Sequence, residues 1–172
     1  LNTEDATVPS LLINNAEKKG LAGIVVINTS SKEITNATIK SKFAGRVTET
    51  KLPSIPAMAM RKVIVEFDAS DITAPGKHRC ELILSQKSGQ LDTASIMLDA
   101  PVPGAQYSAT FISAIDGSLQ YYAVTPQIDP QPSGNALFLS VHGAGVEAIG
   151  QARAYKPKDW GTLVAATNRR PR

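Results

Sequence analysis

The residues best placed to do chemistry are His142-Gly143-Ala144-Gly145, which end an apolar run over residues 136–141. Backbone N–H groups at a strand-to-helix turn can bind the negative oxygen of a tetrahedral acyl intermediate. Glycine suits such a turn because it lets the backbone come close to the reacting atoms. A tight turn with no chemical role fits the same four residues, so the surrounding elements decide between the two interpretations.

The elements around this turn change character along the chain. Two β-type segments predict a hairpin around Asp116-Gly117, which is a strong turn signal. They are followed by a predicted buried strand, a short helix and a second buried strand, at residues 136–141, 146–155 and 160–166. Strands that are apolar on both faces are typical of parallel pairs, which need helices on both sides. Because only one short helix is available, we expect an exposed apolar sheet edge.

The first hundred residues have a different pattern. Short β-type runs alternate with turn residues at 21–27, 37–43, 46–52, 60–67, 77–84 and 90–98. This spacing, without a helical period, predicts an antiparallel sandwich of the immunoglobulin or fibronectin kind. Two prolines and a glycine at 101–104 then indicate a linker. We therefore expect a sandwich at residues 1–100, a linker at 101–106 and a second region at 107–172.

Residues 111–126 (FISAIDGSLQYYAVTP) and 139–145 (LSVHGAG) resemble the start of the catalytic domain in prolyl-oligopeptidase-type peptidases and related esterases. Such domains open with a strand, an Asp-Gly turn, a strand ending in proline and a strand with a His-Gly-rich oxyanion loop. The resemblance covers residues 107–172. It implies a mainly β chain, with an immunoglobulin-like sandwich followed by the truncated start of an α/β-hydrolase sheet. The accessory domain of that family is more often a propeller, so the sandwich is a departure.

The resemblance assigns roles to the turn. It places Gly143, Ala144 and Gly145 in the oxyanion loop and gives His142 the role of ordering that loop, not of the catalytic base, which follows the serine and aspartate in this fold. The sequence contains no Gly-x-Ser-x-Gly motif. The resemblance therefore implies a catalytic serine beyond Arg172, a peptide or ester substrate, no cofactor, and a sandwich that contacts the catalytic domain.

Two further side chains near the end of the chain are candidates for substrate contacts. Arg169 follows the last apolar segment, at the carboxyl end of a strand, where open α/β sheets bind ligands. We expect it to contact a substrate carboxylate, with a solvated tail as the alternative for the basic cluster at 169–172. Trp160 precedes the same segment, and packing at a sheet edge explains it better than a place in a pocket.

Composition excludes several classes of function. The chain is 42% hydrophobic and 19% charged with a formal charge of +3, as in ordinary globular domains. It has no basic stripe with interleaved aromatics, so we expect no nucleic-acid binding. No apolar stretch approaches the roughly 20 residues that span a bilayer. No cluster of His, Cys, Asp or Glu has the spacing of metal ligands, so we expect no metal site.

The only cysteine, Cys80, lies in an alternating run and should pack as a small hydrophobe. A single cysteine excludes an intrachain disulfide and leaves the redox compartment undecided. His78, in the same run, should be half-buried or on the surface, with no chemistry. For the parent enzyme we favour a secreted or periplasmic location.

Two functions therefore remain open. The first is the N-terminal part of a serine hydrolase, inactive alone, whose isolated fragment would expose an apolar sheet edge and be clipped near residues 101–106. The second is a non-catalytic binding or adhesion module, in which the sandwich presents loops to a protein or polysaccharide. The second predicts an independent, monomeric and protease-resistant fold.

Overall fold

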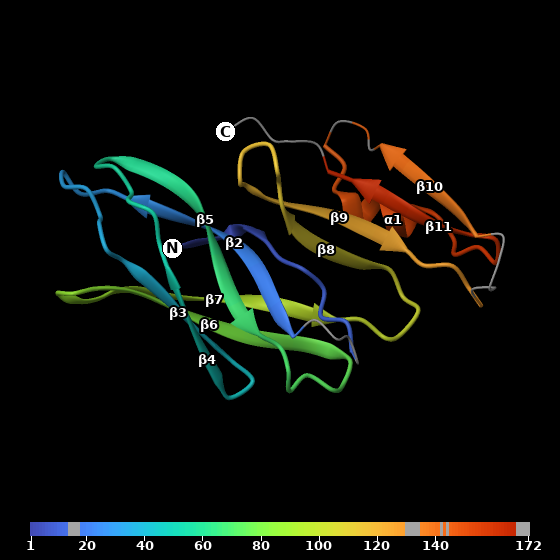
Figure 1. Cartoon of the computed structure of the whole chain (residues 1–172), viewed down its shortest axis with the longest axis horizontal. Coiled ribbons are helices and arrows are strands. Elements are labelled where there is room, and N and C mark those ends of the chain that lie inside the picture. Colours follow the sequence, from blue (N-terminus) through green and yellow to red (C-terminus); the bar gives the residue numbers. More distant parts are fainter. Residues whose placement is uncertain (14–17, 130–134, 142, 144, 168–172) are drawn as a thin grey trace.

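The computed structural model describes residues 1–13, 18–129, 135–141, 143 and 145–167. Its elements are mostly strands, arranged as a sandwich and a smaller sheet at one end (Figure 1). The strands are β1 (Asn2–Thr7), β2 (Lys19–Asn28), β3 (Thr38–Phe43), β4 (Arg46–Lys51), β5 (Ala59–Asp68), β6 (Gly76–Gln86), β7 (Gly89–Ala100), β8 (Tyr107–Ile112), β9 (Leu119–Thr125), β10 (Ala136–Val141) and β11 (Gly161–Ala166). The one helix among the described residues is α1 (Ala148–Ala154).

The sandwich consists of two antiparallel sheets with the strand orders β1-β2-β5 and β4-β3-β6-β7. Alternate residues point into the core, as the sequence pattern predicts for strands with one wet face. On β5 the buried residues are Val63, Val65 and Phe67, and on β6 they are Cys80, Leu82 and Leu84. The prediction of a mainly β, antiparallel sandwich is confirmed.

Strand β1 is the element that the sequence did not reveal. Its six residues, NTEDAT, carry no apolar alternation. It forms because β2 offers it an edge, with Asn2 opposite Val25 and Thr7 opposite Gly23. Tertiary pairing, and not local propensity, makes this segment a strand.

The smaller sheet has the strand order β10-β11-β9-β8. Strands β10 and β11 are parallel, with Phe138 opposite Leu163, whereas β9 runs antiparallel to both β11 and β8. The predicted hairpin at Asp116-Gly117 is confirmed, because Gly117 has φ +68° and the Ser113 N–H donates to the Ser118 carbonyl at 2.8 Å. The chain therefore crosses from β10 to β11 through α1 and places β11 between β10 and β9.

The smaller sheet is hydrogen-bonded to the sandwich. The Ser10 N–H donates to the Ser108 carbonyl at 2.8 Å, and the Ser108 N–H donates to the Ser10 Oγ at 3.0 Å. The Thr110 hydroxyl donates to the Leu21 carbonyl of β2 at 2.9 Å. Strands β8 and β9 both contact the sandwich, and these hydrogen bonds are made by β8.

Candidate functional site

Residues 142–145, called the glycine turn below, lie between β10 and α1 in the sequence. Gly143 and Gly145 are both exposed. Gly145 has φ +76°, a left-handed conformation that L side chains rarely adopt. The Val146 N–H donates to the Gly143 carbonyl at 3.3 Å, which closes the turn before the helix. Apart from the chain neighbours, no described heavy atom lies within 4 Å of an added Cβ at either glycine. Backbone strain, and not crowding, therefore makes glycine necessary at 145.

Side chains from two strands, β9 and β10, fix the helix that follows the turn. The Tyr121 hydroxyl of β9 donates to the carboxylate of Glu147, just before α1. The Gln151 amide donates to the Ser140 hydroxyl of β10 at 3.0 Å. The Thr125 hydroxyl donates to the Ala152 carbonyl at 2.7 Å. These contacts hold α1 at its start, middle and end and so limit how far the glycine turn can move.

The face of the sheet under α1 is lined with small residues. Ala123 and Ala165 pack against Ala148 and Ala152, and all four are fully buried. Their small side chains let the helix approach the sheet closely. A short helix of seven residues can be held here because the contact surface and the three hydrogen bonds replace intrinsic helix stability.

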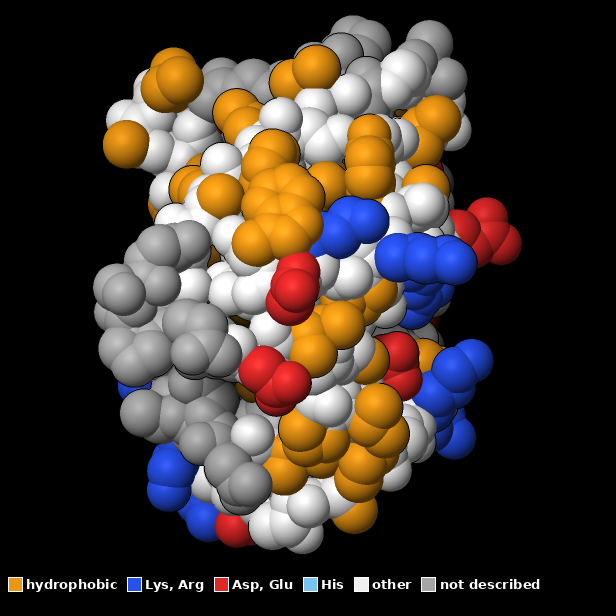
Figure 2. All heavy atoms as spheres, turned by 90° about the vertical axis from the view of Figure 1, so that its right-hand side faces the viewer, with side chains coloured by type: hydrophobic (Ala, Val, Ile, Leu, Met, Phe, Trp, Pro, Cys, Tyr) orange, Lys and Arg blue, Asp and Glu red, His pale blue; other side chains and the backbone are white. Residues whose placement is uncertain are grey.

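Strand β10 is at the edge of the sheet, and its apolar side chains are not buried. Leu137, Leu139 and Val141 are 73%, 71% and 78% exposed. The prediction of a buried strand is therefore wrong for this chain, because no described element covers its outer face or pairs with its free edge. The related expectation of an exposed apolar sheet edge is confirmed. Figure 2, which views this end of the molecule, shows several groups of apolar side chains separated by charged ones.

The aromatic pair at the start of this edge is a packing contact. The rings of Phe138 and Trp160 meet edge-to-face with centroids 4.7 Å apart. Trp160 remains 49% exposed. This arrangement confirms the expectation that Trp160 packs at a sheet edge.

Three of the predicted site residues, His142, Ala144 and Arg169, lie outside the described residues. Their expected roles stay predictions. Gly143 and Gly145 are where the sequence placed them, at the carboxyl end of β10. The contacts that fix the turn were missed, because Tyr121 and Glu147 are 26 residues apart and carry no spacing signal.

The remaining titratable candidates belong to the sandwich. Cys80 is fully buried, and desolvation raises the pKa of its thiol to about 11, as expected for a small core residue. His78 is half-buried, and the centroid of its ring lies 6.4 Å from the ring centroid of Phe43. Arg46 donates to Asp71 at 2.6 Å, and this hydrogen bond lowers the pKa of the Asp71 carboxyl.

Within the part of the chain that the structure describes, no three His, Cys, Asp or Glu residues converge as a metal site. Among the same residues no helix has the length and apolar character to cross a bilayer.

The comparisons with known proteins find weak similarity to solved structures. No protein-family model matches the sequence, and no curated protein matches it. Among solved structures, the exo-chitosanase CsxA of Amycolatopsis orientalis is similar at 17% sequence identity and a TM-score of 0.40. Two variants of the same enzyme in complex with PNP-beta-D-glucosamine give the same values. The similar part covers 69% of this chain and only 14% of the exo-chitosanase chain, and at this TM-score it carries no argument about function.

Proposed function

We propose that this chain is the N-terminal part of a serine hydrolase, a peptidase or esterase, in which the Gly143–Gly145 turn binds the oxyanion of an acyl intermediate. The observation that carries the proposal is the pair of parallel strands β10 and β11, which are connected through α1, with the glycine turn at the carboxyl end of β10. That end of a strand is where open α/β sheets bind ligands. One oxyanion donor contributes about 2.7–4 kcal/mol to transition-state stabilisation.

The sheet order supports the proposal. A hairpin, β8 and β9, precedes two parallel strands of which the later one, β11, is inserted next to β9. The apolar side chains Leu137, Leu139 and Val141 of β10 are exposed. Because apolar parallel strands are normally covered by helices, their exposure supports a larger sheet with further covering elements. In the proposed enzyme, a further strand of the same polypeptide pairs with the free edge of β10, and a further helix covers its exposed face.

In the proposed reaction this chain supplies the oxyanion turn, and residues after Arg172 supply the serine, histidine and aspartate. A serine Oγ attacks the carbonyl of the substrate while a histidine accepts its proton and an aspartate orients the histidine. The carbonyl oxygen becomes negative and is held by N–H groups of the glycine turn. The contacts of Tyr121 with Glu147 and of Gln151 with Ser140 keep that turn preorganised.

The first test is the reading frame after Arg172, which should encode a Gly-x-Ser-x-Gly motif, then an aspartate, then a histidine. A reading frame without them would contradict the proposal and leave the non-catalytic binding module. The second test uses the full-length protein with p-nitrophenyl butyrate and a dipeptide p-nitroanilide as ester and peptide substrates. Gly145→Ala forces a side chain into the left-handed conformation and should lower kcat by about 100- to 1,000-fold.

Gly150→Ala is the matched control. Gly150 lies inside α1, with open space around an added Cβ. Because alanine is favoured over glycine in a helix by about 1 kcal/mol, this variant should be more stable and keep its kcat. Equal kcat in both variants would contradict the role of the turn.

A further inference from the structure

A groove of about 910 Å³ lies where β8 meets the sandwich, and neither Gly143 nor Gly145 lines it. Its walls include Lys19 and Leu21 of β2, Glu66 of β5, and Ser108 and Thr110 of β8. It is bordered by two strand edges and not by loops alone, and each edge has outward backbone groups that pair with no strand of the described residues.

The first edge belongs to β8. The Ser113 N–H donates to the Ser118 carbonyl, so odd-numbered residues of β8 pair with β9 and even-numbered ones point away. The Ser108 backbone confirms this alternation, since both its N–H and its carbonyl bond to Ser10. Ser10 thus already occupies this edge at Ser108, through its backbone N–H and its side-chain hydroxyl. The backbone N–H and carbonyl of Thr110 point the same way, and no described strand pairs with β8 on that side.

The second edge belongs to the first half of β2. The Lys18 carbonyl accepts from the Ala69 N–H at 2.7 Å, so even-numbered residues here face β5 and odd-numbered ones face away. The Leu21 carbonyl confirms this, because it accepts the Thr110 hydroxyl. Strand β1 pairs with β2 only at Gly23 and Val25, which leaves the outward backbone groups of Lys19 beside the groove.

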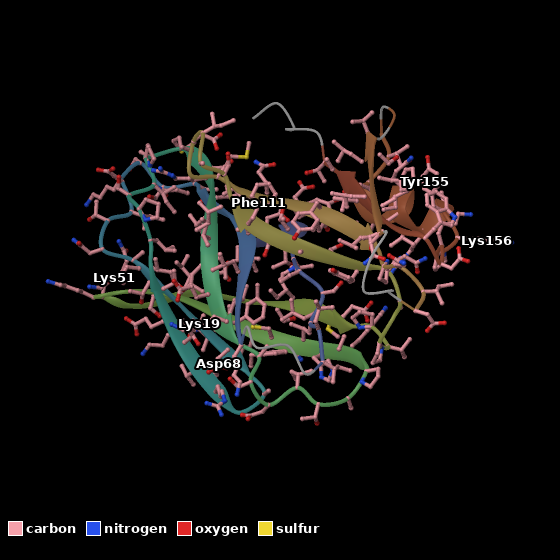
Figure 3. The ribbon with its side chains drawn as sticks, turned by 45° about the vertical axis from the view of Figure 1, so that its right-hand side comes forward. Lys19, Lys51, Asp68, Phe111, Tyr155 and Lys156 are labelled. Carbon is pink, nitrogen blue, oxygen red and sulfur yellow. The ribbon has the colours of Figure 1, made fainter. Side chains whose placement is uncertain are left out.

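The groove also carries charge of both signs. Lys19, Leu21 and Glu66 share the outer face of their sheet, since Leu21 lies opposite Glu66. Asp68, the cross-strand neighbour of Lys19, accepts hydrogen bonds from Ser70 and lies 3.6 Å from Arg46. No ion pair of Lys19 is found among the described residues, which leaves its ammonium for a ligand. Figure 3 shows Lys19 and Asp68 at the same end of β2 and β5, apart from Lys51.

We propose that this groove binds an extended peptide, which pairs with the free edge of β8 and places an acidic side chain against Lys19. Main-chain pairing supplies affinity in this mode of recognition, and side-chain contacts supply specificity. Two lysines, Lys18 and Lys19, and one glutamate, Glu66, line the groove, and this mixed charge fits a peptide that carries an acidic side chain. A nucleic acid needs a larger surplus of cations. The proposal does not rest on the hydrolase proposal and holds whether or not a catalytic serine exists.

The test measures fluorescence anisotropy of a fluorescein-labelled acetyl-TETET-amide peptide with the full-length protein. Binding should weaken about tenfold when alternate peptide nitrogens are methylated, because two edge hydrogen bonds are lost. Lys19→Glu should weaken binding about fivefold and favour acetyl-TKTKT-amide instead. The matched control is Lys51→Glu, another exposed strand lysine, which should bind like the wild type.

Hydrogen exchange locates the peptide. Bound peptide should slow exchange of amides in residues 107–112 and 19–22. The proposal is overturned by no binding at millimolar peptide, by equal affinity for the methylated peptide, by equal weakening in both lysine variants, or by protection confined to β10. Because the assay reads no hydrolysis, its failure is distinct from failure of the proposed function.

Discussion

Gly20→Ala should destabilise the sandwich strongly although it adds one methyl group. An added Cβ at Gly20 would lie 2.1 Å from Cζ of Phe67 and 2.3 Å from a second ring carbon. Ordinary contact begins near 3.4 Å, so the ring would have to move by about 1.3 Å. Phe67 is 1% exposed and packs edge-to-face on Phe43 with centroids 5.6 Å apart. The ring therefore has no free space to enter.

Overpacking of this kind costs about 1–3 kcal/mol, and the depth of the clash places Gly20→Ala at the upper end of that range. For a chain of this size the melting temperature should fall by about 5–10 °C. Urea unfolding followed by circular dichroism measures the free energy directly.

Gly23→Ala, on the same strand, is the matched control. Its Cβ would lie 2.9 Å from Cε of Lys62, the flexible end of a surface side chain. The Lys62 ammonium donates to the Asp5 carbonyl and the Thr7 hydroxyl, so the lysine moves aside only by giving up exposed hydrogen bonds. We expect a loss of about 1 kcal/mol, smaller than for Gly20→Ala, because a flexible side chain and not a buried ring has to shift. Phe67→Leu removes the obstructing ring, so Gly20→Ala should cost less in that background. Equal losses for the two glycine variants, or the same Gly20→Ala cost with leucine at 67, would refute this explanation.

Three other predictions follow from the described contacts. Burial raises the pKa of Cys80 from 9.0 to about 11, so between these pH values the folded state keeps a proton that the unfolded state loses. The free energy of unfolding should therefore fall as the pH rises from 9 to 11. Urea titrations of Cys80→Ala should show a smaller decline over the same range. Arg46→Ala should raise the pKa of Asp71 toward its usual range, measured by carboxyl NMR shifts, and an unchanged value would contradict the assigned cause. If β10 is covered in the full-length protein, Leu139→Lys should cost about 3 kcal/mol there by thermal unfolding, whereas an exposed position would tolerate it within about 0.5 kcal/mol.

The sandwich could be predicted because its strands carry their own pattern. Strands β5 and β6 alternate between core and solvent, and the burial of Cys80 follows from its place in that alternation. Strand β1 could not be predicted, since its polar residues become a strand only by pairing with β2. The local sequence shows how apolar and polar side chains alternate. It does not show whether another strand offers a free edge to pair with.

The candidate site divides in the same way. The need for glycine at 145 follows from a turn after an apolar strand, and its φ of +76° agrees. An exposed apolar sheet edge is expected from the sequence, but which strand forms it could not be predicted, because an apolar strand such as the one with Leu139 has the same composition at the edge of a sheet and in its centre. The contact between Tyr121 and Glu147 joins two elements whose distance depends on the strand order, which the residue types do not encode.

The central claim is tested most directly by treating the full-length protein with a fluorophosphonate probe and identifying the labelled residue by mass spectrometry. We expect one serine to be labelled, within a Gly-x-Ser-x-Gly motif that follows Arg172, and labelling to slow about 100-fold or more in Gly145→Ala. No labelled serine, or labelling that is insensitive to the turn, would contradict the assignment of the glycine turn as an oxyanion site.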